Sequence, residues 1–473
     1  MARPSASTEA LRARIDHPVI DSDGHAIEYL PLVYEEMTRI GGAAVAEGFR
    51  TLAEGNRALP HLDADQARAL GAFRMGWWGL PTDTYDRATV MLPRLFYERM
   101  DEIGIDFAVL YPTYGLIVSG IDDEEVRRAS ARAFNLYYAS EYAGYGDRIA
   151  PAATIPCHTP EEAIEELDYA VGELGFKVVM LGGTVRRPLP GNNEARAARW
   201  IDALGHDSAY DYSPVWQRCV ELGVSPTFHS SGQGWVTRAA LENYVYNKIG
   251  SFAASQEALC RSLFFAGVAQ RFPALRFAFL EAGAAWACNL YSDLFAHWEK
   301  RNVSAVEHYD PARLDRAELR GLFEQYGSLA MKGAIDALED ALHPLSDLQD
   351  PKVDEFAAAR VASPEDIRRV FAENFFFGCE ADDRMNATAF SPGLTPDGAK
   401  LNAIFASDIA HWDVPDLREV LPESYELVEH GLMTVADYRD FVFTNPARLW
   451  AESNPAFFEG TRVESAVGSL MAD

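Results

Sequence analysis

The chain has 473 residues, of which 48% are hydrophobic and 24% charged, so it is long enough for two domains or one large barrel. This composition excludes disordered and fibrous classes. Lys and Arg number 42 against 71 Asp and Glu, and the resulting charge of −29 excludes nucleic acid as a partner, because such a field repels phosphate backbones.

The five cysteines are too sparse for a disulfide framework, and none shows CxxC spacing. The first residues lack the apolar segment of a signal peptide, and no run approaches the about 18 apolar residues of a membrane span. We therefore expect a cytoplasmic protein with reduced thiols and no membrane partner.

Eight short β-branched or aromatic runs, each bounded by turn or polar residues, recur along the chain and alternate with amphipathic helical patterns. In chain order they are Val19–Asp23, Phe107–Tyr111, Ile149–Ile155, Gly175–Leu181, Ser225–His229, Arg276–Glu281, Asn374–Cys379 and Ile404–Asp408. Thr159 with Glu162 forms a capping-box signal for a helix, and Asn445-Pro446 is predicted to open the last one. This alternation predicts a single α/β domain over residues 1–473, a (β/α)8 TIM barrel; a doubly wound sheet is the alternative, but no GxGxxG follows the first strand.

Two spacings, about 26–106 and 290–373, are too long for plain strand-helix units and predict large insertions. The first contains the paired tryptophans Trp77 and Trp78, and the second contains an acidic stretch, Asp336–Asp354. Long insertions after barrel strands commonly form lids or subunit contacts, so a homo-oligomer is one expectation.

Ionisable residues follow five of the predicted strands, at the ends that meet at the mouth of a barrel. They are Asp21, Asp23, His25 and Glu28 at the first strand, His229 at the fifth, Glu281 at the sixth, Glu380 at the seventh, and Asp408 and His411 at the eighth. Alternation places Asp21, Asp23 and His25 on one side. Each feature alone is ordinary, but like charges crowded into one cavity repel unless a cation or proton neutralises them. The sequence therefore predicts a bound divalent metal; a carboxylate-rich set favours iron or manganese, with zinc as a further option.

The order DxH at strand one, His at strand five, an acidic residue at strand six and SDxxHxD at strand eight resembles the amidohydrolase-related TIM barrels, including aromatic-acid decarboxylases. The resemblance runs from Val19 to Trp450 and implies that Asp23, His25, His229 and Asp408 bind metal. The family often has His at strand six, where this chain has Glu281. The pattern DSDGHxxE with Glu281 and Glu380 looks more like a branch that includes a dinuclear non-haem iron monooxygenase of platensimycin and platencin biosynthesis.

The main hypothesis is accordingly a dinuclear non-haem iron monooxygenase that hydroxylates an unactivated carbon of a bulky apolar, terpenoid-like small molecule. Two ions, expected to be iron, would be held by Asp23, His25, Glu28, His229, Glu281 and Asp408, with Asp21, Glu380 and His411 as additional ligands or supporting partners. Asp408, His411 and Glu281 are the candidate catalytic residues. Trp235, Trp286 and Trp412 could line the substrate cavity.

The alternative is a mononuclear hydrolase or decarboxylase, in which one metal polarises the substrate and Asp408 or His411 moves protons. A noncatalytic binding protein on an enzyme fold is the third hypothesis, disfavoured because so many buried charges are retained.

Overall fold

The computed structural model describes residues 6–54, 62–70, 80, 83–189, 199–229, 240–342 and 354–472. Eight parallel strands form one sheet in the order β1-β2-β3-β4-β7-β8-β9-β10. Their bounds are Ile20–Ala26 (β1), Phe107–Pro112 (β2), Ile149–Ile155 (β3), Val178–Leu181 (β4), Pro226–Phe228 (β7), Phe277–Phe279 (β8), Phe375–Glu380 (β9) and Asn402–Ala406 (β10). All eight predicted strands are present, and only their ends differ.

The sheet closes between its first and last strands. The Asp408 amide donates to the Asp23 carbonyl at 3.1 Å, and the His25 amide donates to the Ile409 carbonyl at 3.0 Å. A doubly wound sheet has open edges, so this closure confirms the predicted barrel. The parallel register also aligns the carboxyl ends of the strands, for example Phe228 with Phe279 and Ala406 with Glu380.

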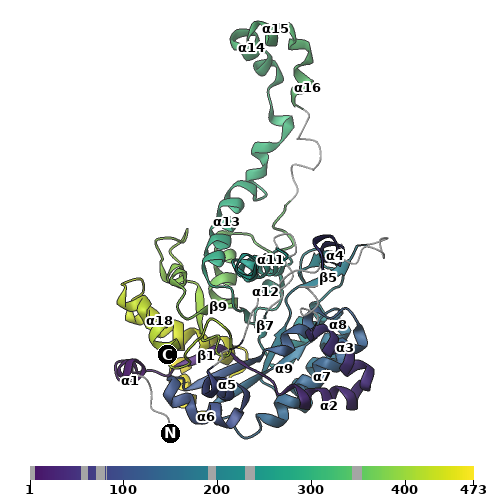
Figure 1. Ribbon diagram of the computed structural model, residues 1–473. Helices are drawn as coiled ribbons and strands as arrows, with labels where there is room; N and C mark the ends of the chain where they lie inside the picture. Colours follow the sequence, from purple (N-terminus) through teal and green to yellow (C-terminus); the bar gives the residue numbers. More distant parts are fainter. Residues whose placement is uncertain are drawn as a thin grey trace.

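Helices follow the strands and cover the barrel (Figure 1). Before β4 the α-helices are Ala6–Arg12 (α1), Leu30–Gly41 (α2), Ala43–Glu54 (α3), Ala64–Leu70 (α4), Thr84–Met91 (α5), Pro93–Ile103 (α6), Glu124–Glu141 (α7) and Pro160–Leu167 (α8). After β4 they are Ser213–Leu222 (α9), Tyr244–Lys248 (α10), Ser251–Phe265 (α11), Val268–Arg271 (α12), Ala285–Arg301 (α13), Arg316–Tyr326 (α14), Leu329–Gly333 (α15), Leu338–Leu342 (α16), Pro364–Arg369 (α17), Val420–Glu429 (α18), Val435–Arg439 (α19), Asn445–Ala451 (α20) and Glu464–Ala472 (α21). A short antiparallel hairpin, Val185–Pro188 (β5) and Arg199–Asp202 (β6), follows β4.

Local sequence signals set two helix starts. Thr159 and Glu162 form the predicted capping box at α8, with the Glu162 amide 3.3 Å from the Thr159 hydroxyl and the Thr159 amide 3.2 Å from the Glu162 carboxylate. Asn445 begins α20, but α21 follows it, so the expectation that this is the last helix is wrong. The Asn445-Pro446 pair predicts where a helix begins, but it does not predict that no helix follows.

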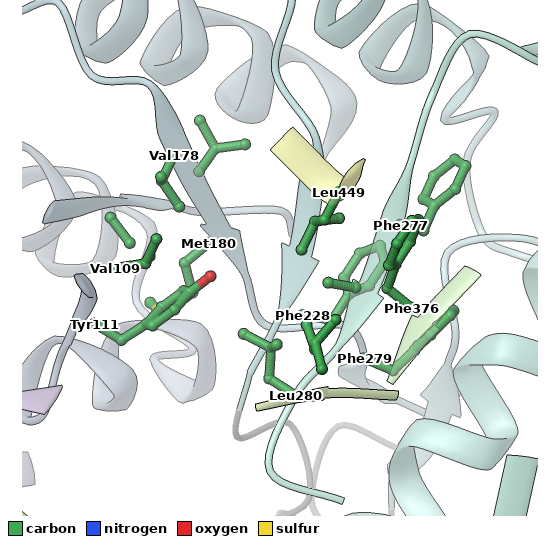
Figure 2. Close-up of a cluster of buried hydrophobic side chains, with 14 of the residues drawn as sticks. Val109, Tyr111, Val178, Met180, Phe228, Phe277, Phe279, Leu280, Phe376 and Leu449 are labelled. Carbon is green, nitrogen blue, oxygen red and sulfur yellow. The ribbon is translucent and has the colours of Figure 1, made fainter. Parts of the chain in front are cut away.

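Aromatic side chains fill the side of the barrel formed by β7, β8 and β9. Figure 2 shows Phe228, Phe277, Phe279 and Phe376 gathered there with Leu449 of α20. The rings of Phe228 and Phe279 are stacked at 5.6 Å between centroids, and all of these side chains are buried. Packing of this kind fixes the strand ends rigidly, which is what a site built across several strands needs.

The two long spacings hold helices. Residues between β1 and β2 include α2 to α6, which pack against the barrel. Residues after β8 form α13 and then an arm, residues 302–342, whose helices α14, α15 and α16 stand far from the barrel (Figure 1). Trp77, Trp78 and residues 343–353 of the acidic stretch Asp336–Asp354 lie outside the described residues.

Candidate metal centre

The end of β1 aims two donor side chains into the barrel mouth. A bulge interrupts the pairing of β1 with β2 between Asp21 and Gly24. A Cβ on Gly24 would lie 2.7 Å from the Asp21 carboxylate, so only glycine allows this close packing. Beyond the bulge, Asp23 and His25 both point to the same group of ligand atoms as His229.

Three donor atoms, from Asp23, His25 and His229, lie close together, and a fourth, from Asp408, lies beside His25. Nε2 of His25 lies 3.0 Å from Nε2 of His229, and 3.6 Å from both Asp23 Oδ1 and Asp408 Oδ1. His229 Nε2 also lies 3.2 Å from Asp23 Oδ1. Two ligands that are about 2.1 Å from one ion are separated by about 3.0 Å at a right angle and about 3.4 Å at a tetrahedral angle. The spacing of these donors therefore fits a shared first-row divalent ion.

The protonation of the histidines fits the same ion. Burial, together with His411 and His229, holds the pKa of His25 well below its usual value, and burial lowers that of His411 to about 3. Both imidazoles are therefore neutral at pH 7, the form that binds metal. Burial would also lower the pKa of His229, but the charge of Asp23 outweighs it and raises that pKa.

A further group of ligand atoms, from His25, Asp408 and His411, shares His25 with the first group and shares Asp408 with an acidic group. The carboxylates of Glu281, Glu380 and Asp408 have ligand atoms within 4.8 Å of one another. Burial raises the pKa of Glu380 to about 8, and burial and Asp413 raise that of Asp408 well above its usual range. Without a cation, these two carboxyl groups keep protons, because three ionised carboxylates so close together repel.

Backbone strain marks two of these positions. Glu281 and Asp408 have φ angles of 55° and 48°, in the left-handed region that non-glycine residues rarely adopt. This conformation costs on the order of 1 kcal/mol of folding free energy per residue. Residues that adopt it cluster at functional sites. The barrel thus holds the two carboxylates at the mouth in conformations that sequence alone does not favour.

Comparison with known proteins finds a family model that matches part of the barrel. Residues 97–328 match the model of a family described as amidohydrolase. The matched range contains His229 and Glu281 and ends before β9.

Three solved structures are similar to this chain. An amidohydrolase of Mycobacterium avium subsp. paratuberculosis K-10 is 18% identical, with a TM-score of 0.51 over 92% of this chain and 100% of that one. A dihydroxybenzoic acid decarboxylase of Polaromonas sp. JS666, with bound manganese and 2-nitroresorcinol, is 16% identical, with a TM-score of 0.49 over 94% and 99%. A 5-carboxyvanillate decarboxylase of Novosphingobium aromaticivorans DSM 12444, complexed with manganese, is 15% identical, with a TM-score of 0.47 over 95% and 98%. At these identities the likeness concerns the fold.

The barrel does not bring every predicted ligand to the mouth. Both oxygens of Glu28 accept backbone hydrogen bonds, from Tyr114 at 2.9 Å and Gly115 at 3.1 Å, so the carboxylate holds the turn after β2. Asp21 accepts from the Ser407 amide at 3.0 Å and its hydroxyl at 2.6 Å, which ties β1 to β10. The bulge after Asp21 breaks the expected alternation and separates it from Asp23.

One residue of the site, Lys248, was not singled out from the sequence. Lys248 ends the short helix α10, and its Nζ lies 3.2 Å from Glu281 Oε1. Burial opposes its charge, but Glu281 and Asp408 raise its pKa, while Lys248 in turn lowers that of Glu281 against the effect of burial. No local motif surrounds Lys248, so only the fold reveals it.

The tryptophans proposed to line a cavity differ in their placement. Trp286 packs on Phe279 and Phe377, with ring centroids 6.0 and 5.5 Å away, and belongs to the barrel packing. Trp412, next to His411, is 38% exposed and meets Tyr244 edge to face at 5.5 Å. Trp235 lies outside the described residues. In the part of the chain that is described, no helix is long and apolar enough to cross a membrane.

Proposed function

We propose that this protein is a metal-dependent hydrolase or decarboxylase of a small molecule, acting through one divalent ion held by Asp23, His25, His229 and Asp408. The observation that carries the proposal is that Nε2 of His25 lies 3.0–3.6 Å from donor atoms of His229, Asp23 and Asp408, which come from the ends of β7, β1 and β10. A divalent ion bound there would supply a Lewis acid that polarises a carbonyl or carboxyl oxygen of the substrate.

The residues around the ion suit proton transfer. His411 Nδ1 lies 2.6 Å from Asp408 Oδ1, and both side chains are buried. A neutral imidazole beside a carboxyl group of raised pKa can accept a proton from one atom and return it to another. Both hydrolysis and decarboxylation need such a transfer, the first to activate water and the second to protonate the carbon that loses its carboxyl group.

The acidic group of Glu281, Glu380 and Asp408 favours one second candidate, a dinuclear oxygenase. Asp23, Asp408, Glu281, Glu380 and Asp413 would together carry five negative charges if ionised, more than one divalent ion and Lys248 neutralise. A second divalent ion would balance this charge, and protons on Asp408 and Glu380 would do so equally well. The family match supports the hydrolase or decarboxylase over the oxygenase.

Metal analysis with a substrate screen tests the proposal. Protein purified without oxygen and freed of metal would be reloaded with Mn²⁺, Zn²⁺ or Fe²⁺, and the ions per chain counted by mass spectrometry. Aromatic carboxylic acids, esters, lactones and amides would then be screened for carbon dioxide release or hydrolysis. We expect one ion per chain and turnover without oxygen. Two irons per chain with substrate-dependent oxygen uptake would overturn the proposal in favour of the oxygenase.

A further inference from the structure

The hairpin of β5 and β6 carries arginines to the side of the barrel where the metal centre lies. The carbonyl of Leu181, the last residue of β4, accepts a hydrogen bond from the His229 amide at 3.0 Å. Arg186 in β5 comes five residues after Leu181, so the backbone between them spans at most about 18 Å. The hairpin therefore follows the carboxyl end of β4, next to the strand that supplies His229.

Arg186 is set into the barrel rather than spread over its outer surface. Its Nη2 would lie 3.6 Å from a Cβ placed on Gly120, the last residue of the 3-10 helix Tyr114–Gly120 that follows β2. Burial lowers the pKa of His158, just after β3, to about 3, and Arg186 is one of three arginines whose charges add to this. Arg186 is exposed to solvent, yet burial by the surrounding protein lowers the pKa of its guanidinium. A side chain with both properties stands in a recess that solvent can enter.

The arginines around this recess have carboxylate partners, but Arg186 does not. The pairs are Arg127 with Glu162 at 2.8 Å, Arg199 with Asp122 at 3.3 Å, and Arg187 with Asp202. Within the described part of the chain, Arg186 makes no hydrogen bond or ion pair. Asp122, the carboxylate whose charge acts on Arg186, is already bound to Arg199. One guanidinium in the recess is thus left without a counter-charge, in a chain whose net charge is −29.

A carboxylate is the anion that suits this guanidinium. The planar fork of arginine matches the two oxygens of a carboxylate and binds them through parallel hydrogen bonds. The negative field of the whole chain repels a polyanion or an anionic lipid surface, whereas a single anionic group on a small molecule meets the local positive charge. The recess therefore fits one end of a small acid.

The barrel gives this position a direction relative to the acidic group of Glu281, Glu380 and Asp408. In the closed sheet of eight strands, β2, β3 and β4 lie four places from β8, β9 and β10, and so face them across the mouth. An anionic end of a substrate is repelled on the side of the acidic group and attracted on the side of Arg186. The two sides together allow only one orientation of such a molecule.

We propose that Arg186 binds a carboxylate group of the substrate, at a distance from the group of the same molecule that lies at the metal. This assignment rests on the proposed function and narrows its substrate class to small molecules that carry an anionic group remote from the reacting one. Arg186 is then a specificity-determining residue that fixes the substrate at a second point.

Acids of graded length test this two-point binding. The probes are the α,ω-dicarboxylates from succinate to dodecanedioate and the monocarboxylates of the same chain lengths, titrated calorimetrically onto the Mn²⁺-loaded protein. At one chain length we expect the dicarboxylate to bind at least about tenfold more tightly than its monocarboxylate, because one carboxylate reaches the metal and the other reaches Arg186. In the metal-free protein this advantage should disappear.

Variants of Arg186 assign the second point. Arg186→Met should abolish the advantage of the dicarboxylate and keep the metal content of the wild type. Arg186→Lys should retain part of the advantage, since an ammonium keeps the charge but not the planar fork. Arg94→Met is the matched control, because it removes an exposed arginine that pairs with Glu98 at 2.8 Å on α6, and it should bind every probe like the wild type.

The outcomes separate this inference from the proposed function. Equal affinities of di- and monocarboxylates at every length, or an advantage that persists in Arg186→Met or is lost in Arg94→Met, would overturn the inference. Inorganic phosphate tests for a free anion: if it protects Arg186 from phenylglyoxal, read by peptide mass spectrometry, while no dicarboxylate is preferred, the recess does not hold a substrate carboxylate. Normal metal content with no preferred dicarboxylate contradicts this inference alone, whereas a protein that takes up no metal contradicts the proposed function.

Discussion

The two halves of the barrel mouth differ in the charged groups that they contain. In the half formed by β1 and β7, two imidazoles and one carboxylate stand 3.0–3.6 Å apart. In the half formed by the ends of β8, β9 and β10, three carboxyl groups share a small volume with the ammonium of Lys248. The donor spacing in the first half fits a bound cation, while the second half can be neutralised by protons, by Lys248 or by a second cation. Asp408 belongs to both halves and couples them.

The largest effect is expected when a donor is removed from the half formed by β1 and β7, here called the histidine half. Asp23→Ala should reduce metal content to near zero, because loss of a direct ligand weakens binding by more than the about 10–100-fold typical of a ligand's hydrogen-bond partner. The measurement is ions per chain after equilibrium dialysis. Asp16→Ala, at an exposed carboxylate before β1, is the control and should keep its metal. Full metal content in the Asp23 variant would remove the histidine half as the binding site.

The next largest effect is expected when the ammonium group of Lys248 is removed from the half formed by the ends of β8, β9 and β10, here called the acidic half. Lys248→Met leaves Glu281 without its ion-pair partner, so affinity for a second divalent ion should rise at least tenfold. Titration calorimetry with Mn²⁺ on the singly loaded protein measures this. Lys400→Met, which breaks the ion pair with Asp437 on another face, serves as the control. An unchanged or weaker second binding step would mean that Lys248 does not hold the place of a cation.

The acidic half should also make the metal-free protein sensitive to pH. The pKa of Glu380 is about 8 in the folded protein and 4.5 in its unperturbed state, so the folded protein keeps a proton that the unfolded chain releases. The free energy of unfolding should therefore fall as pH rises from about 4.5 to 8, by up to about 1.4 kcal/mol per pH unit. Urea unfolding of the metal-free protein across this window measures the slope. Glu380→Gln should flatten it, and equal slopes in the two proteins would contradict this assignment.

The smallest effect on metal is expected at Glu28. Its carboxylate holds the amides of Tyr114 and Gly115 and does not belong to the groups of ligand atoms at the mouth. Glu28→Gln should keep the metal content of the wild type and lose about 1–3 kcal/mol of stability, because an amide nitrogen then faces a backbone donor. Thermal unfolding and metal analysis of the same sample separate the two effects. Loss of metal at unchanged stability would restore Glu28 as a ligand.

Sequence patterns predicted the barrel because its strands are apolar runs bounded by turn residues, a signal that each segment carries locally. The same reasoning placed Asp23, His25, His229 and Asp408 at the barrel mouth, since a polar residue directly after a buried strand lies there. Glu28 was predicted as a metal ligand but accepts hydrogen bonds from backbone amides. The spacing of residues along a helix or strand does not predict which backbone amides a carboxylate will contact. The position of Asp21 was predicted wrongly because a β-bulge shifts the alternation of side-chain directions along a strand, and the residue types around a bulge do not reveal it.

Tertiary structure alone decided the composition of the acidic half. Lys248 lies in a short helix with no motif around it, and only closure of the barrel brings its ammonium to Glu281. The left-handed backbone at Glu281 is likewise imposed by packing, since glutamate rarely adopts it. The sequence by itself determined the eight strands and the chemical types of the donors, because those depend on neighbours along the chain. Which donors share a cation, and which are neutralised by a lysine, depends on distances between segments far apart in sequence, and these exist only in the folded chain.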